Sequence, residues 1–157
     1  MLYPPLSTDF DRQVRQRTHA AHGALSLAAG KKLSKHLKSC IGPWITSLYD
    51  SDRQVSRVAL DSFQTVFDND KKREIVYERY TGDILKYVSD VLLNETAATI
   101  SDERFITAED RETRWALVVG MCLTTLSNLA GIPIRIRNVL KYRIGDREDQ
   151  GRIQGTV

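Results

Sequence analysis

The sequence is poor in the residues that build metal centres and disulfide frameworks. Its 157 residues include two cysteines, Cys40 and Cys122, and three histidines, His19, His22 and His36. The cysteines lie far apart and neither has a second cysteine close by, which indicates a protein of a reducing compartment. The histidines have no carboxylate or cysteine spaced to complete a ligand set, so we expect no metal and no cofactor in this chain.

Long apolar runs are missing too. No stretch approaches the roughly 18 consecutive apolar residues of a membrane-spanning helix, and residues 1–5 lack the basic start and apolar core of a secretory signal. We therefore expect no membrane contact and a location in the cytosol. Cys40 and Cys122 fall in apolar stripes, where cysteine packs as a small hydrophobe, and no nucleophile, base and orienting group occur together. No catalytic residue is expected.

Charge is plentiful but unevenly distributed around a net value of +3. Residues 1–57 hold nine Lys/Arg against four Asp/Glu, whereas residues 58–130 hold eight against thirteen. Residues 131–157 are again basic, with six against three. This polarity predicts an oriented electrostatic surface, but not a protein built mainly for nucleic acid.

One short segment occurs twice. Residues 9–14, Asp-Phe-Asp-Arg-Gln-Val, recur as Asp-Ser-Asp-Arg-Gln-Val at 50–55, with five identities in six positions at an offset of 41 residues. An offset of about 40–47 residues is typical of HEAT and armadillo units, which are built from paired helices. Aspartate before a helix accepts backbone N–H bonds and suits the positive end of the helix dipole, so each copy is expected to begin a helix.

The apolar spacing after each copy is helical. The first helix is expected to stop at Gly30, and its predicted buried face carries Val14, Ala21, Leu25 and Ala28. A second helix follows over residues 33–48, with a kink at Pro43. Trp44 and Trp115 are expected to be interior anchors rather than stacking platforms for bases.

Further helices are expected over residues 55–67, 71–80, 84–92 and 107–131. Thr81-Gly82-Asp83 is expected to separate two of them, residues 94–106 form a long loop, and Thr107 begins a cap. The prediction is an all-α fold. A short α-solenoid of two and a half to three HEAT-like repeats occupies residues 1–130, and residues 131–157 form an irregular, disordered tail.

The strongest candidate for a binding surface is a set of basic residues in the first third of the chain: Arg12, Arg15, Arg17, Lys31, Lys32, Lys35 and Lys38. On a regular helix Lys31, Lys35 and Lys38 would share one face, opposite the buried one. A run of Lys/Arg gains affinity for a polyanion such as RNA by releasing counterions. The alternative is a solvated face that only keeps the protein dissolved.

Three stretches resemble the N-terminal HEAT region of listerin, the large E3 ubiquitin ligase of ribosome-associated quality control. They are residues 38–50 (Lys-Ser-Cys-Ile-Gly-Pro-Trp-Ile-Thr-Ser-Leu-Tyr-Asp), residues 59–67 (Ala-Leu-Asp-Ser-Phe-Gln-Thr-Val-Phe) and residues 71–74 (Lys-Lys-Arg-Glu). Residues 6–9 and Val14-Arg15 are also similar, and the resemblance covers about residues 6–130. It implies a scaffold that contacts the large ribosomal subunit and its quality-control partner proteins.

In listerin a distant C-terminal RING domain recruits the ubiquitin-conjugating enzyme. Two cysteines and three histidines cannot build the zinc sites of a RING, so the resemblance implies zinc only outside this chain and no ligase activity of the chain alone. The chain then resembles a terminal piece of a longer superhelix. One alternative is a HEAT adaptor for protein cargo, of the transport-receptor or phosphatase-scaffold type, which would use the acidic region after residue 58. A small enzyme is the other alternative.

Overall fold

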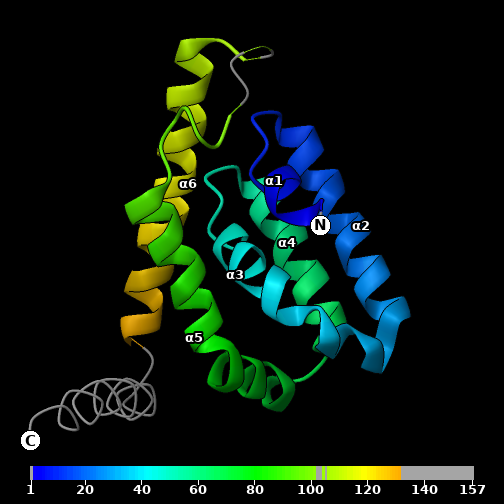
Figure 1. Ribbon diagram of the computed structural model, residues 1–157. Helices are drawn as coiled ribbons and strands as arrows, with labels where there is room; N and C mark the ends of the chain where they lie inside the picture. The colour runs from blue at the N-terminus through cyan, green and yellow to red at the C-terminus, as the bar shows by residue number, and fades with distance from the viewer. Residues whose placement is uncertain (1, 102–103, 105, 132–157) are drawn as a thin grey trace, which may run out of the picture.

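The computed structural model describes residues 2–101, 104 and 106–131, and every regular element among them is helical. The elements are α1 (Tyr3–Ser7), α2 (Arg12–Ala29), the 3₁₀ helix η1 (Gly30–Lys35), α3 (Leu37–Ser47), α4 (Arg53–Val66), α5 (Asp70–Asn94) and α6 (Ala108–Gly131) (Figure 1). The predicted all-α fold is confirmed. The predicted tail lies outside the described residues, apart from Gly131 at the end of α6.

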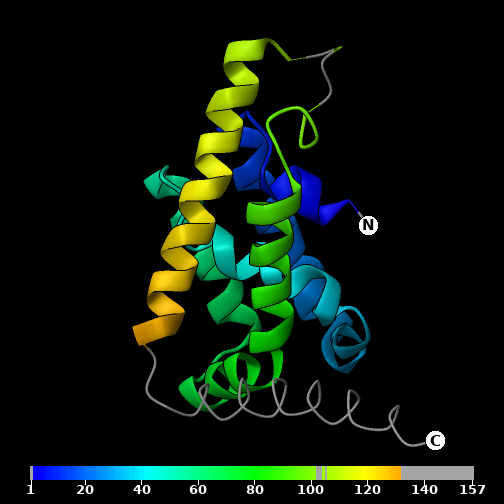
Figure 2. The same ribbon diagram turned by 60° about the vertical axis from the view of Figure 1, so that its left-hand side comes forward.

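Helices α2 and α3 each pack against the equivalent helix of the next unit. The most extensive contacts join α2 to α4 and α3 to α5, and α6 then lies along α5 (Figure 2). The two helices that follow the repeated hexapeptide are therefore stacked side by side, as are the helices that follow each of them. Stacking of equivalent helices from successive units is the arrangement of an α-solenoid, which the sequence offset predicts.

Both copies of the hexapeptide begin a helix in the same way. Asp11 Oδ1 accepts a hydrogen bond from the backbone N–H of Gln13 at 2.6 Å, and Asp52 Oδ1 accepts from Gln54 and Val55 at 2.9 and 3.2 Å. These bonds satisfy donors that the first turn of a helix leaves unpaired. The prediction that an aspartate in each copy caps a helix is confirmed.

A buried ion pair joins the two helix starts. The Arg15 guanidinium donates from Nε to Asp50 Oδ2 at 2.8 Å and from Nη2 to Asp50 Oδ1 at 3.3 Å. Its Nη1 also donates to the backbone carbonyls of Asp9 and Phe10, at 2.8 and 3.0 Å. Arg15 is 4% exposed. Because its donors are met on both sides, Arg15 holds the start of one repeat against the start of the next.

The buried face of α2 differs from the predicted one. The residues that α2 buries are Arg15, His19, Gly23 and Ser26, whereas Ala21, Leu25 and Ala28 are exposed and Val14 is half-buried. Leu25 is 71% exposed. The prediction is wrong because α2 meets α4 through small and hydrogen-bonding side chains, and its apolar residues lie on the side that faces α1 and solvent.

Two predicted helix boundaries are also wrong. The Thr81-Gly82-Asp83 segment does not interrupt a helix, since α5 runs without a break for 25 residues. Thr81 is buried and its hydroxyl donates to the Tyr77 carbonyl, so packing outweighs the roughly 1 kcal/mol that a glycine costs inside a helix. The predicted helix over residues 33–48 is instead divided into η1 and α3.

Other boundaries agree with the sequence. Pro43 lies inside α3, and the described residues between α5 and α6 carry no helix. Thr107 caps α6, because its Oγ1 accepts from the Asp110 backbone N–H at 3.1 Å and donates to the Asp110 carboxylate at 2.7 Å. Here the reciprocal bond of the usual capping box is replaced by a bond between two side chains.

Trp44 lies at the centre of the core and is fully buried. Its Nε1 donates to Ser62 Oγ at 2.9 Å, and its ring meets Phe63 edge-on with the centroids 5.6 Å apart. Cys40 and Cys122 are fully buried as well, and burial raises the pKa of each thiol to about 11. The predicted packing roles of Trp44 and both cysteines are confirmed. Trp115 is half-buried at the edge of the packing between α5 and α6.

The sequence pattern does not predict the short helix α1, which lies across the other helices at the N-terminus. Tyr3 stacks on His22 with the ring centroids 3.7 Å apart, and its hydroxyl lies 3.1 Å from His19 Nδ1. From α6, Arg114 donates to the Thr8 carbonyl at 2.6 Å. The one signal in the sequence is the pair of prolines at 4–5, because proline suits the first positions of a helix.

We expect Gly23→Ala to destabilise the fold by about 1–3 kcal/mol, since α2 and α4 approach most closely here. A Cβ at position 23 would stand 2.7 Å from Ser62 Cβ and 3.2 Å from Ser62 Cα, so the helices would have to move apart. Urea denaturation measures the change. Gly120→Ala is the matched control: it is helical with nothing within 4 Å of the added methyl, and it should leave stability unchanged or raise it by up to about 1 kcal/mol. Equal effects of the two substitutions would contradict the close approach.

We also expect the fold to lose stability between pH 6.5 and pH 4. Burial lowers the pKa of His19 and of His22 from 6.5 to about 4. Within this window the unfolded chain binds protons that the folded chain does not, so stability is complete above pH 6.5 and declines as the pH falls. The lowered pKa of His19 should by itself reduce the free energy of unfolding by about 2 kcal/mol when the pH falls from above 6.5 to about 5.

Urea midpoints measured near pH 7.5 and near pH 5 test this expectation. His19→Gln should flatten the pH dependence, whereas replacement of the exposed His36 by glutamine should leave it unchanged. A pH dependence that is the same in His19→Gln as in the parent chain would show that His19 is not the responsible group.

Candidate binding surface

The structure divides the basic set predicted from the sequence. Arg15 is buried against Asp50 and cannot reach a partner. The other six residues are exposed: Arg12 and Arg17 on α2, Lys31, Lys32 and Lys35 on η1, and Lys38 in the first turn of α3. At about 1.5 Å per residue, α2 places Arg12 roughly 27 Å from Gly30, where η1 begins. The four lysines therefore form one group, which we name the lysine cluster, and Arg12 stands well apart from it.

Backbone geometry at the end of α2 creates the lysine cluster. Gly30 has φ +52°, a conformation that side chains disfavour, and its N–H closes the last turn of α2 on the carbonyls of Ser26 and Leu27. The chain then continues as the 3₁₀ helix η1, in which side chains three residues apart are aligned, so Lys32 and Lys35 lie on one side. The predicted shared face of Lys31, Lys35 and Lys38 assumed a regular α-helix and is wrong for this reason.

The positive charges of the lysine cluster have few negative charges near them in the sequence. Between Asp11 and Asp50 the sequence contains no acidic residue. The ion pairs found among the described residues involve Arg12, Arg15, Lys72 and Arg73 and none of the cluster lysines. Four exposed ammonium groups within eight residues consequently present a positive surface that suits a polyanion.

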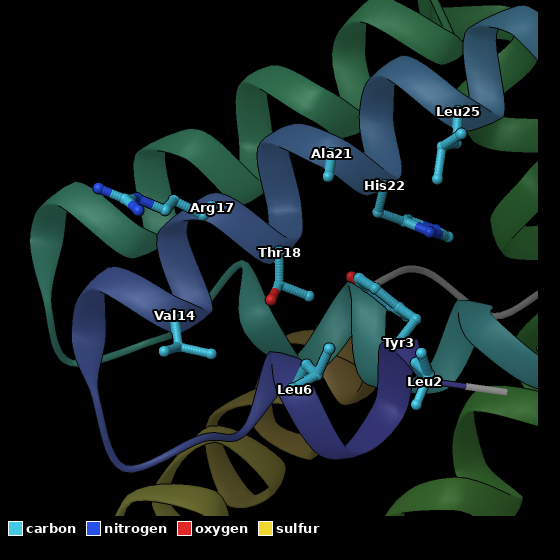
Figure 3. A pocket seen from close by; sticks show the side chains of 9 residues that line it. All are labelled: Leu2, Tyr3, Leu6, Val14, Arg17, Thr18, Ala21, His22 and Leu25. Atoms are coloured by element: carbon cyan, nitrogen blue, oxygen red, sulfur yellow. The ribbon is translucent and has the colours of Figure 1, made fainter.

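A second surface feature is an apolar groove of about 400 Å³ between α1 and α2. Figure 3 shows Leu2, which precedes α1, and Leu6 of α1 on one side of the groove, Val14, Thr18, Ala21 and Leu25 of α2 on the other, and Arg17 projecting outward at one end. Tyr3 and His22 face each other at its inner side. Leu2 is 76% exposed and Leu25 71%. Three of the four apolar residues that the sequence assigned to the buried face of α2, Val14, Ala21 and Leu25, therefore line a surface groove instead.

The three histidines of the sequence lie in two different places in the fold. His19 and His22 contact Tyr3, whereas His36 lies exposed between η1 and α3. Over residues 2–101, 104 and 106–131, no three His, Cys, Asp or Glu side chains are grouped to hold a metal ion. In the same part of the chain no helix is both long enough and apolar enough to cross a membrane.

Sequence reasoning missed the burial of Arg15 and the groove. The signal for the first was present: Asp50 belongs to the repeated hexapeptide, and in the stacked arrangement of a solenoid the two copies must lie side by side. The groove had no such signal, because it depends on α1 folding back over α2.

Comparison with known proteins agrees with the fold. A family model described as the N-terminal domain of E3 ubiquitin-protein ligase listerin matches residues 1–132. Among curated relatives named E3 ubiquitin-protein ligase listerin, the chain is 37% identical over 129 residues to that of Schizosaccharomyces pombe and 33% identical over 128 residues to that of Neurospora crassa. The protein of Xenopus tropicalis is 34% identical over 128 residues.

Each alignment covers 82% of this chain but only 8% of the relative's length. The match thus concerns a small part of much larger proteins, and the part that matches is the repeat region described above. By its sequence, this chain belongs to the listerin family and corresponds to that family's N-terminal domain.

Proposed function

We propose that this chain is the docking region of a listerin-type E3 ubiquitin ligase and acts in the cytosol. It holds the ligase on stalled large ribosomal subunits, together with their quality-control partner proteins, so that the trapped nascent chain is ubiquitinated and degraded. Family membership supports the ligase. The observation that carries the docking role is the lysine cluster: Lys31, Lys32, Lys35 and Lys38 are exposed together on a surface without neighbouring acids in the sequence.

Ribosomal RNA is a suitable target for such a surface. Each phosphate that a lysine neutralises releases a condensed counterion, and the gain in entropy drives binding without any requirement for base sequence. The lysines are set on η1 and the first turn of α3, and Leu37 and Cys40 at the start of α3 are buried in the core. The cluster is therefore fixed to the scaffold, which allows it to set the orientation of the whole solenoid on the subunit.

In this proposal another part of the ligase carries out the chemistry of ubiquitin transfer. The ubiquitin-conjugating enzyme binds a zinc-containing RING domain that is not part of these 157 residues. Docking contributes by proximity: a conjugating enzyme tethered near the nascent chain reacts at a high effective concentration. The chain alone is then a binding protein without ligase activity.

Co-sedimentation with purified large ribosomal subunits tests the proposal. We expect the chain to pellet with the subunits at low salt, and we expect the affinity to fall steeply as salt is raised. Replacement of Lys31, Lys32, Lys35 and Lys38 by glutamate should weaken binding at least about 600-fold near 0.1 M salt, because four phosphate contacts are lost.

The matched control reverses four exposed basic residues outside the cluster, Arg53, Arg57, Lys71 and Lys86. This variant has the same net charge as the cluster variant and should keep most of the binding. Equal losses in the two variants would indicate attraction by overall charge alone. If Leu25→Asp abolished binding while the cluster variant bound normally, the contact would lie in the apolar groove, and the proposed role of the lysines would be wrong.

A further inference from the structure

Ser34 lies in the middle of the lysine cluster. It follows Lys31, Lys32 and Leu33 and precedes Lys35, and it is exposed on η1. Its hydroxyl donates to the Lys31 carbonyl at 3.0 Å. The hydroxyl is therefore accessible, and a negative charge placed on it would stand among the positive charges of the cluster.

The segment that carries Ser34 is a short element at the surface of the molecule. None of the six residues of η1 is buried, and no side chain caps either end of it. Its principal contacts are with the two helices that flank it, α2 and α3. A 3₁₀ helix has poorer hydrogen bonds than an α-helix, and Gly30 supplies a backbone that turns easily at the start. An enzyme that binds its substrate as an extended strand would have to unwind these six residues and release Leu33, which packs against the core, while α2 and α3 stay folded.

Lysines three and two residues before a serine form a recognition pattern for protein kinases with acidic substrate grooves. Such kinases select substrates by charge complementarity on the N-terminal side of the acceptor. Lys31 and Lys32 stand at these positions before Ser34, and both are exposed.

Two nearby serines lack the combination found at Ser34, which has both basic residues at the two positions and an exposed hydroxyl. Ser39 is exposed, but His36 and Leu37 occupy the positions three and two residues before it, and it lies within α3. Ser56 has Arg53 three residues before it, but it is half-buried in the first turns of α4. Both serve as internal comparisons.

We propose that Ser34 is a phosphorylation site for a basophilic serine/threonine kinase, and that its phosphate weakens the binding of polyanions to the lysine cluster. In the reaction Ser34 Oγ attacks the γ-phosphorus of MgATP, and the new Oγ–P bond forms as the bond from that phosphorus to the bridging oxygen of ADP breaks. The hydroxyl proton passes to the kinase's catalytic aspartate, and ADP leaves. The regulatory consequence rests on the proposed docking function, whereas the modification itself does not.

The size of the effect follows from the charges. A phosphoserine carries a charge of about −1.5 to −2 near pH 7 and can pair with neighbouring lysines. About two of the four lysines would then no longer release counterions from a bound polyanion. Near 0.1 M salt this corresponds to a loss of about 25-fold in affinity for single-stranded RNA, with a shallower dependence on salt.

The modification is tested with the purified chain, MgATP and the catalytic subunit of cAMP-dependent protein kinase as the probe. Mass spectrometry should locate one phosphate on Ser34 in the parent chain and in the Ser39→Ala and Ser56→Ala variants. Ser34→Ala should lack it, and a Lys31→Gln, Lys32→Gln double variant should incorporate it much more slowly. Phosphate on Ser39 or Ser56 in preference to Ser34, or incorporation unaffected by the double substitution, would overturn the assignment.

The consequence is measured on kinase-treated chain by elution from heparin and by co-sedimentation with large ribosomal subunits. Phosphorylated chain should leave heparin at lower salt and bind subunits about 25-fold more weakly, whereas kinase-treated Ser34→Ala should match the untreated protein. Unchanged elution after complete phosphorylation would overturn the regulatory role. Failure of the unmodified chain to bind subunits would count against the proposed docking function alone, since the heparin comparison does not depend on it.

Discussion

The contact on which the other helices depend is the buried pair of Arg15 and Asp50. A guanidinium removed from water is costly unless its donors are satisfied, and here Asp50 and two backbone carbonyls of the α1–α2 connection accept from it. Neither partner can move without leaving the other charge buried and unpaired. The pair therefore fixes the register between α2 and α4, the two helices of the stack that follow the repeated segment.

This register decides which side of α2 faces inward. With Arg15 turned towards Asp50, His19, Gly23 and Ser26 follow at helical spacing and are buried, and Gly23 permits the close approach of α4 at Ser62. The apolar side chains of α2 are then directed outward. The strap formed by α1 covers part of them, Tyr3 closes over the two histidines, and the remainder lines the groove.

The sequence correctly predicted the features that depend on interactions between residues close together in the chain. The aspartate caps of α2 and α4, the cap at Thr107, Pro43 within a helix and the buried Trp44 all follow from side chains that act within a turn or within one strong apolar stripe. The errors arise where tertiary contacts or an unusual backbone conformation prevail. Packing of Thr81 carries α5 past a glycine, and Gly30 converts the next segment to a 3₁₀ helix. Arginine is usually exposed, so residue type alone predicts the wrong environment for Arg15. Its burial depends on Asp50, which lies 35 residues away in the sequence.

The contacts that stabilise the repeat use the acidic residues that flank the lysine cluster in the sequence. Asp11 and Asp52 are used as helix caps, and Asp50 is used by Arg15. Arg12, the cation nearest to Asp52, is 3.6 Å from its carboxylate. The acids that flank the acid-free stretch between Asp11 and Asp50 are thus committed to structure at the helix starts, about one helix length from η1. None of the ion pairs found among the described residues involves the four lysines, so in the proposed docking the bound polyanion supplies their counter-charge.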